Sequence, residues 1–260
     1  MNKALRATHS RRASDALIEA GRVRVNGAVA GAGDRLREGD VVTLDGARVE
    51  WQRLEPALVE ASVLEARNAY LVYNKPAGVT CTTDVRVKGN LIEATAGAVP
   101  PGQRLFSVGR LDKESTGCLL LTNDGRLPNS LLRAAAGHDK LYRVVPHVRL
   151  SDAHLAEMRS GVVITTVAQR DGRAAPPLTA RTLPCRVERD GAALLITLQE
   201  GRNRQIRKML EALGYDTLEL HRQRFMHVGL EGLRPGCWRA LNKGEMAGIR
   251  AALQAPPHLA

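Results

Sequence analysis

The chain has 260 residues, of which 38 are Lys or Arg and 27 are Asp or Glu, so its formal charge is +11. This length suffices for one sizeable core and a small second module. The charge suits a polyanionic partner such as nucleic acid, although an arginine-rich solvated surface explains it equally well. The sequence has no signal peptide, no clustered Cys or His ligands and no apolar run of the roughly 20 residues that a membrane span needs. We therefore expect a cytoplasmic protein that binds neither a membrane nor a metal.

The N-terminal part is predicted to form a basic helix that leads into short strands. Ser10 is a suitable N-cap for a helix over 11–20. Strand-forming residues then flank the pairs Asn26-Gly27 and Asp45-Gly46, which favour tight hairpin turns. Residues 1–48 are therefore interpreted as a compact module of one helix and several short strands.

The stretch Ser10–Gly27 is similar to the S4 RNA-binding domain. In that family the helix with its paired arginines faces the RNA backbone, so the resemblance implies that this module contacts RNA. Its candidate RNA-binding residues are Lys3, Arg6, Arg11, Arg12, Arg22 and Arg24. Taken alone, the same cations are more typical of a solvated charged face.

A second domain is predicted after a linker. Residues 49–66 have mixed charge and no clear period, so they are interpreted as the linker, the second domain as 67–253, and 254–260 as an unstructured tail. Strands are predicted at 70–73, 140–145 and 194–198, and a helix at 151–159.

The segment Gly201–Gly214 is predicted to contain an amphipathic helix with Asn203 as its cap. Its apolar stripe consists of Ile206, Met209, Leu210 and Leu213. Four cations crowd its beginning, namely Arg202, Arg204, Arg207 and Lys208. Cations at that end interact unfavourably with the helix dipole, by about 0.3–1 kcal/mol each at exposed sites. We therefore predict that they serve an anionic ligand.

Asp112 lies in a polar loop between two apolar segments, with Arg110 two residues before it. This arrangement is typical of an active-site loop. The commoner role of a loop aspartate, a hydrogen bond that caps the turn at Ser115-Thr116, stays open at this point.

Four blocks occur in the order found in the RsuA class of pseudouridine synthases, which act on ribosomal RNA. The blocks are Asn74–Gly78, Gly109–Asp112, Lys140–Val144 and Gly201–Arg207. The resemblance spans the chain from Asn2 to about Ile249. It implies an α+β fold with a small S4-like RNA-binding domain and a catalytic domain whose central sheet is mixed and largely antiparallel. It also implies an isomerase that moves uracil from an N1 to a C5 linkage in ribosomal RNA without a cofactor. We expect a monomer.

The resemblance also implies roles for individual residues. Asp112 would be the catalytic residue, Arg207 its ion-pair partner and Tyr142 the ring against which uracil lies. Ile206 would pack on the same pocket, and Arg110 would fill the space that the uridine leaves in the RNA. The remaining candidate residues are Arg202, Asn203 and Arg204 for the substrate and Lys208 for the RNA backbone. The sequence Arg202-Asn203-Arg204-Gln205 resembles the branch that modifies large-subunit RNA.

The chemistry of the residue types is consistent with this resemblance. Isomerisation of uridine adds no water, so one carboxylate suffices where glycoside hydrolysis uses two. Attack at C1′ and proton abstraction at C2′ both need an oriented carboxylate, so the sequence leaves this choice open. Stacking of an extruded base on an aromatic ring is worth roughly 1–3 kcal/mol, and only 3% of the residues are aromatic. Tyr142 is one of few available platforms.

Two other functions remain open on the sequence alone. The chain could be a non-catalytic protein that binds or chaperones ribosomal RNA, with a structural Asp112, or a nucleoside hydrolase that releases uracil. Tyr142 is also compatible with an ordinary strand aromatic and Arg207 with a surface cation. Lys75 lies in a turn where a solvated lysine is common, and it is not included among the candidate residues.

RNA binding should depend steeply on salt, and the N-terminal module should contribute to that dependence. Each phosphate contact adds about −0.7 to the slope of log affinity against log salt on single strands. Removal of residues 1–48 should therefore flatten the slope measured by titration of RNA at several salt concentrations. An unchanged slope would show that this module does not contact RNA.

Overall fold

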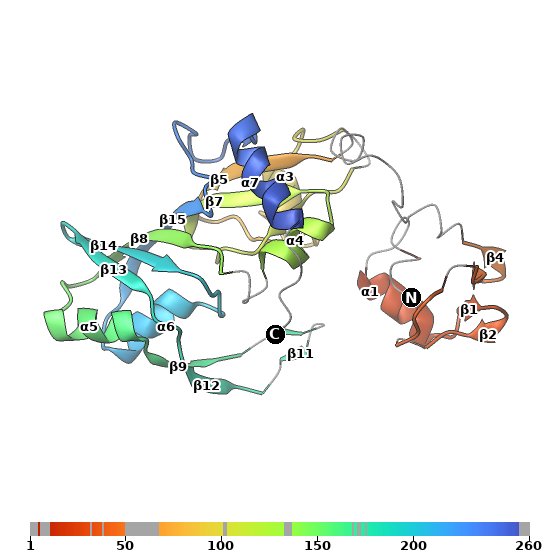
Figure 1. Cartoon of the computed structure of the whole chain (residues 1–260), viewed down its shortest axis with the longest axis horizontal. Helices are drawn as coiled ribbons and strands as arrows, with labels where there is room; N and C mark the ends of the chain where they lie inside the picture. The colour runs from red at the N-terminus through yellow and green to blue at the C-terminus, as the bar shows by residue number, and fades with distance from the viewer. Residues whose placement is uncertain are drawn as a thin grey trace. The chain divides into compact units, whose positions relative to one another are not determined.

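The computed structural model describes residue 5 and residues 11–31, 33–37, 39–49, 68–100, 103–132, 137–167, 169–170, 173–174 and 176–254 (Figure 1). Contacts divide the chain into two units, Met1–Leu64 and Glu65–Ala260. Of the predicted linker only Val49 is described, and of the predicted tail only Gln254, which ends a helix. The domain boundaries themselves stay predictions.

The N-terminal unit is a short helix with a four-stranded sheet. Its elements are α1 (Arg11–Glu19), β1 (Val23–Val25), β2 (Ala28–Val29), β3 (Val42–Leu44) and β4 (Ala47–Arg48). The order is β2-β1-β3-β4, with antiparallel pairs throughout. The turn residues Asn26, Gly27, Asp45 and Gly46 all have positive φ, between 50° and 86°. The predicted helix and both predicted hairpin turns are therefore confirmed.

The C-terminal unit is built on an eight-stranded sheet. Its strands are β5 (Tyr70–Lys75), β6 (Phe106–Val108), β7 (Thr116–Thr122), β8 (Lys140–Pro146), β13 (Arg186–Asp190), β14 (Ala193–Leu198), β15 (Thr217–Phe225) and β16 (Trp238–Ala240). The order is β13-β14-β8-β15-β7-β5-β16, with β6 paired to β7. Among the described strands of this sheet only β15 and β7 are parallel, so the predicted mixed and largely antiparallel sheet is confirmed.

The other elements of this unit are helices and small hairpins. The helices are α3 (Leu91–Ala94), α4 (Arg126–Leu131), α5 (Asp152–Ser160), α6 (Gln205–Ala212) and α7 (Lys243–Gln254). The short strands are β9 (Val163–Thr166), β10 (Gln169–Arg170), β11 (Arg173–Ala174) and β12 (Leu178–Arg181). Helix α5 begins as predicted, because the Ser151 hydroxyl accepts a hydrogen bond from the His154 amide at 3.2 Å.

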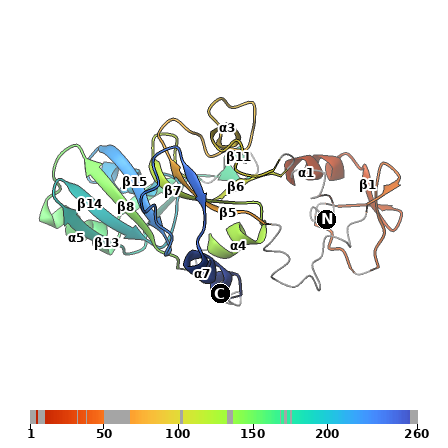
Figure 2. The same ribbon diagram turned by 90° about the horizontal axis from the view of Figure 1, so that it is seen from above.

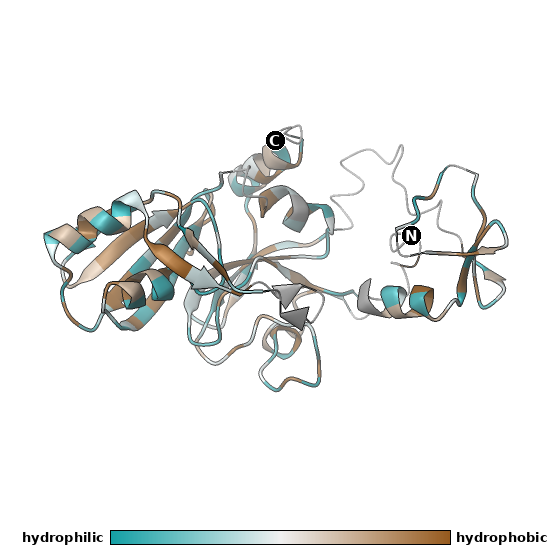
Figure 3. Cartoon of the chain, turned by 90° about the horizontal axis from the view of Figure 1, so that it is seen from below, coloured by the Kyte–Doolittle hydropathy of each residue, from teal (hydrophilic) through white to brown (hydrophobic). Residues whose placement is uncertain are grey.

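Helices cover both faces of the sheet. Helices α5 and α6 pack on the half formed by β13, β14, β8 and β15, where Val144, Ile196 and Met209 are fully buried. Both helices carry hydrophobic and hydrophilic residues, as expected for helices with one buried side (Figure 3). On the other half, alternate residues of β5 face opposite clusters, with α3 on one face and α4 and α7 on the other (Figure 2).

The beginning of α6 differs from the prediction. The N-cap is Arg204, in a left-handed conformation with φ 50° and no side-chain cap, so the expected role of Asn203 as the cap is wrong. The turn is held instead by Gln205, whose side chain accepts a hydrogen bond from the Arg202 amide at 3.0 Å and donates one to Glu200 at 2.7 Å. The predicted end at Gly214 is confirmed, with φ 84° at this residue.

Gly117 allows an unusually close approach of two strands. It pairs with Arg222 where β7 and β15 run parallel, and its φ is 105°. A Cβ atom at this position would lie 2.2 Å from the Arg222 carbonyl oxygen, which is well inside van der Waals contact. Only glycine therefore fits the parallel pair as it stands.

We expect Gly117→Ala to destabilise the unit by about 3 kcal/mol or more, because the added methyl forces β7 and β15 apart and positive φ costs an L residue about 1–2 kcal/mol. Gly191→Ala is a matched control, since Gly191 also has positive φ but no described atom within 4 Å of the point where a Cβ would lie. The control should lose only the conformational cost. Denaturant unfolding of both variants measures the difference, and equal losses would contradict the role given to close approach.

Candidate active site

Asp112 lies in the loop between β6 and β7. A tight turn follows it, in which the Ser115 amide donates to the main-chain carbonyl of Asp112 at 3.1 Å. The Asp112 side chain takes no part in that turn among the hydrogen bonds of the described residues, and it is 28% exposed. The carboxylate is therefore held at the protein surface by its backbone and stays open to a ligand.

Lys75 anchors this loop from below. The lysine is completely buried, so its interpretation as a solvated turn residue is wrong. Its ammonium group donates to the carbonyls of Ser115 at 2.7 Å, Lys113 at 3.2 Å and Pro76 at 3.0 Å. Burial lowers its pKa. The local sequence gave no signal for this role, because two of the three carbonyls that Lys75 binds, those of Lys113 and Ser115, belong to a loop about 40 residues away.

Two guanidinium groups of the α6 region face the Asp112 carboxylate. Arg207 Nε lies 3.9 Å from Asp112 Oδ2, and Arg204 Nη1 lies 3.7 Å from the same oxygen. Arg207 is more buried and is oriented by hydrogen bonds to the Thr217 carbonyl and, at 3.5 Å, to the Ser115 hydroxyl. Its Nε is buried, and no described residue accepts a hydrogen bond from it. Arg207 thus approaches Asp112, as predicted, and forms a loose ion pair with it.

Glu114 is a second carboxylate beside the same cations. Its Oε2 lies 3.6 Å from Arg204 Nη1, but its side chain is 64% exposed. A main-chain hydrogen bond within the residue and the charges of Arg204 and Arg207 hold its pKa below the ordinary range. Glu114 is therefore an ionised neighbour of Asp112 that lacks the close contact with Arg207.

Tyr142 lies between the two halves of the unit. It is partly buried on β8 and packs against both the cluster that contains Leu111 and the cluster that contains Ile206. Leu111 precedes Asp112, and Ile206 precedes Arg207 on α6. The ring is therefore placed between the loop of the carboxylate and the helix of the guanidinium. Ile206 itself is only 4% exposed and forms part of the core.

The other predicted substrate residues lie in different surroundings. Arg110 and Asn203 are exposed. Arg202 is occupied within the protein, since it binds Glu200 at 2.9 Å and the carbonyls of Ala180 and Arg181. Lys208 donates to the Thr165 carbonyl at 2.7 Å. Arg202 and Lys208 thus connect the start of α6 to the β9 and β12 hairpin.

The cations predicted to bind RNA in the N-terminal unit are described only in part. Arg22 forms an exposed ion pair with Asp45, with a hydrogen bond of 2.8 Å, and Arg24 is exposed and donates to the Gly27 carbonyl. Exposed pairs of this kind contribute at most about 1 kcal/mol, so they compete weakly with RNA. Only the backbone of Arg11 and Arg12 is described, and Lys3 and Arg6 lie outside the described residues.

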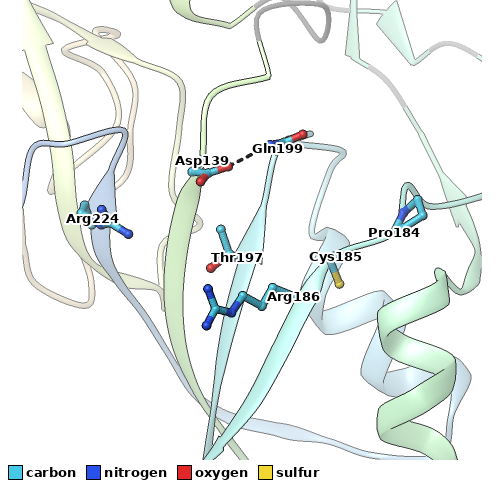
Figure 4. A pocket seen from close by; sticks show the side chains of 7 residues that line it. All are labelled: Asp139, Pro184, Cys185, Arg186, Thr197, Gln199 and Arg224. Atoms are coloured by element: carbon cyan, nitrogen blue, oxygen red, sulfur yellow. Dashed lines mark hydrogen bonds between the residues drawn. The ribbon is translucent and has the colours of Figure 1, made fainter. Parts of the chain in front are cut away.

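A groove of about 450 Å³ lies on the face of the C-terminal sheet opposite to Tyr142 (Figure 4). Its lining includes Arg186, Thr197 and Arg224. These three residues lie in one row of paired residues across the sheet, together with Leu141. Residues in such a row share a face, and Leu141 faces the opposite way from its neighbour Tyr142 because side chains alternate along a strand. The groove is therefore separate from the Asp112 site. In the described part of the chain, no His, Cys, Asp and Glu side chains gather as a metal site, and no helix is long and apolar enough to span a membrane.

We expect Lys75→Met to lower the free energy of unfolding by about 2–4 kcal/mol, because it leaves buried carbonyl groups of the Asp112 loop without a donor. Amide hydrogen exchange at Ser115 should accelerate as the loop loosens. The control is Lys113→Met, an exposed lysine of the same loop, which should change stability by less than about 0.5 kcal/mol. Unchanged exchange at Ser115 in Lys75→Met would contradict the anchoring role.

Comparison with known protein families and structures agrees with this arrangement. A family model described as RNA pseudouridylate synthase matches residues 69–212, and a model of the S4 domain matches residues 4–42. The chain is 37% identical over 238 residues to the dual-specificity RNA pseudouridine synthase RluF of Escherichia coli K12, with 91% of this chain and 72% of the relative covered. It is 31% identical over 247 residues to ribosomal large subunit pseudouridine synthase B of Bacillus subtilis, with 93% and 91% covered.

A solved structure shows the same fold. A crystal structure of a pseudouridylate synthase matches with a TM-score of 0.62 at 23% identity, covering 95% of this chain and 98% of that chain. Sequence and fold thus agree over nearly the whole chain. The protein therefore belongs to the RNA pseudouridylate synthase family and is an RNA pseudouridine synthase with an N-terminal S4 domain.

Proposed function

We propose that the protein converts a uridine of ribosomal RNA, in the large subunit, to pseudouridine with Asp112 as its single catalytic carboxylate. The observation that carries this proposal is the placement of Asp112 at 3.9 Å from Arg207 and 3.7 Å from Arg204, on a surface loop beside Tyr142. We also propose that the RNA-binding domain comprises residues 1–48 and the catalytic domain residues 67–253. The protein is proposed to be a monomer in the cytoplasm.

The position of the carboxylate suits the reaction. Two guanidinium groups lie within 4 Å of the carboxylate, and its partial exposure leaves it accessible to a ribose. An ionised carboxylate at this place can attack C1′ or remove the C2′ proton, and either route releases the base with the electron pair of the C1′–N1 bond. The base then rejoins through C5, which loses its proton while N1 gains one, so no water enters and no external oxidant or reductant is needed.

Tyr142 provides a stacking surface for the extruded base, and Arg110 provides a side chain that can fill the gap left in the RNA. Unstacking of the uridine costs a few kcal/mol, and stacking on an aromatic ring returns roughly 1–3 kcal/mol. Tyr142 is partly exposed beside Leu111, where a base near Asp112 can reach it. Arg110 is exposed two residues before the carboxylate and is free to enter the gap in the RNA. Asn203 and Arg204, at the start of α6 near Asp112, are assigned as further contacts to the substrate.

The relatives support ribosomal RNA as the substrate class. One matched relative is a ribosomal large subunit pseudouridine synthase, and another is a dual-specificity RNA pseudouridine synthase. The net charge of +11 favours a polyanionic substrate. The sequence Arg202-Asn203-Arg204-Gln205 favours the large-subunit branch.

Asp112→Asn should abolish pseudouridine formation on a ribosomal RNA transcript, because the amide can act neither as nucleophile nor as base. RNA affinity should stay within about threefold, since the variant removes a negative charge and no phosphate contact. Single-turnover assays with product chromatography measure the rate, and filter binding measures the affinity.

Glu114→Gln is the matched control, because it removes a neighbouring carboxylate that also faces Arg204. It should retain a rate within about threefold of wild type, since surface charges screened by solvent contribute little. Turnover by Asp112→Asn would refute the catalytic assignment. Release of free uracil by the wild type would instead identify a hydrolase, and wild-type inactivity on every ribosomal RNA would favour a binding protein.

A further inference from the structure

Arg222 is a buried cation beneath the candidate site. It is 2% exposed and lies on β15, between β8 and β7. Its register partner on β8 is Tyr142, and its partner on β7 is Gly117. Because directly paired residues share one face of a sheet, the Arg222 side chain lies on the same face as the Tyr142 ring.

The guanidinium group of Arg222 is only partly satisfied. Its Nε donates to the Cys118 carbonyl at 2.6 Å, but its Nη2 is buried and no described residue accepts a hydrogen bond from it. Arg222 forms no ion pair with any carboxylate in the described parts of the chain. Burial of an unpaired charge is costly. A neutral side chain could also donate the hydrogen bond to the Cys118 carbonyl, so this bond does not explain why the residue is an arginine.

Two aromatic rings flank this charge. Arg222 Cζ lies 6.0 Å from the centroid of the Tyr142 ring and 5.4 Å from that of Phe225. The Phe225 ring also contacts a second buried cation, because Lys140 Nζ lies 5.6 Å from its centroid. Burial and the charge of Arg222 lower the pKa of Lys140. A positive charge thus remains at Tyr142, and among the described residues the two rings and the Cys118 carbonyl face it while no carboxylate does.

The same charge reaches the Asp112 loop. Cys81 Sγ accepts a hydrogen bond from the Leu111 amide at 3.5 Å. Burial raises the pKa of the Cys81 thiol, and the positive charges of Lys75, Arg222 and Arg110 oppose that rise. The thiol that accepts from the main chain next to Asp112 is thus surrounded by cations, of which Arg222 is one. The guanidinium itself lies beside Tyr142, the aromatic ring of the candidate site.

We propose that Arg222 is a positioning residue that holds the Tyr142 ring and places an unneutralised positive charge beneath the uracil during its detachment. This inference rests on the proposed function. When the C1′–N1 bond breaks, its electron pair stays with N1 and the detached uracil becomes an anion. The bond between C5 and C1′ then forms, the C5 proton leaves and N1 regains a proton. A fixed cation at the platform favours the anionic stage over the neutral uridine.

The test compares Arg222→Gln with Arg222→Lys on a large-subunit ribosomal RNA transcript. Both side chains can donate a hydrogen bond toward Cys118, but only lysine keeps the charge. The single-turnover rate at saturating enzyme should fall about tenfold or more in Arg222→Gln and stay within about threefold in Arg222→Lys. RNA affinity should stay within about twofold in both, because Arg222 is buried.

Lys140→Met controls for the loss of any buried cation, since the Lys140 ammonium lies over the Phe225 ring and, among the described residues, the cation over the Tyr142 ring is Arg222. It should slow the reaction less than threefold. Thermal unfolding shows whether each variant is folded, and Arg222→Met replaces Arg222→Gln if the latter is not. Three outcomes would overturn the inference and leave the proposed function intact. They are a folded Arg222→Gln or Arg222→Met variant that reacts at the wild-type rate, an Arg222→Lys variant as slow as the neutral one, and a Lys140→Met variant that loses as much rate as the neutral Arg222 variant. Inactivity of the wild type overturns the proposed function and the inference together.

Discussion

The close contact between Gly117 and Arg222 is the constraint on which the catalytic unit depends. It closes the parallel pair of β15 and β7, which is the only junction between the half of the described sheet that carries Tyr142 and the half that follows Asp112. Helix α6, with Arg204 and Arg207, packs on the first half, whereas the carboxylate precedes the second. The ion pair near Asp112 therefore joins side chains from the two halves that this strand pair connects.

Buried cations give the unit a further property. Lys75, Lys140 and Arg222 are nearly or fully inaccessible, and each donates to main-chain carbonyls in place of a carboxylate. Lys75 holds the Asp112 loop from one side, and Arg222 lies beside Tyr142 on the other. Such charges are expensive in a protein interior. For Lys75 and Arg222, a position beside the Asp112 loop and Tyr142 gives this cost a function.

Local patterns predicted the regular elements well. The Asn26-Gly27 and Asp45-Gly46 pairs, the Ser151 cap and the apolar stripe of α6 depend on neighbours in the sequence, and the structure contains all of them. Asn203 failed as a cap because Gln205 and Glu200 satisfy the turn through side chains. Lys75 and Arg222 could not be recognised, since their partners are contributed by distant strands and loops. Ordered motifs, and not residue type, indicated Asp112, Tyr142 and Arg207.

We propose that the carboxylate near Arg204 and Arg207 forms pseudouridine in ribosomal RNA. The most direct measurement is position-resolved mapping of pseudouridine in ribosomal RNA from cells that lack the protein and from the same cells supplied with wild type or Asp112→Asn. We expect one or more positions that lose the modification, regain it with wild type and stay unmodified with the variant. Restoration by the variant, or an unchanged map in cells that lack the protein, would contradict a catalytic role of Asp112 in ribosomal RNA modification.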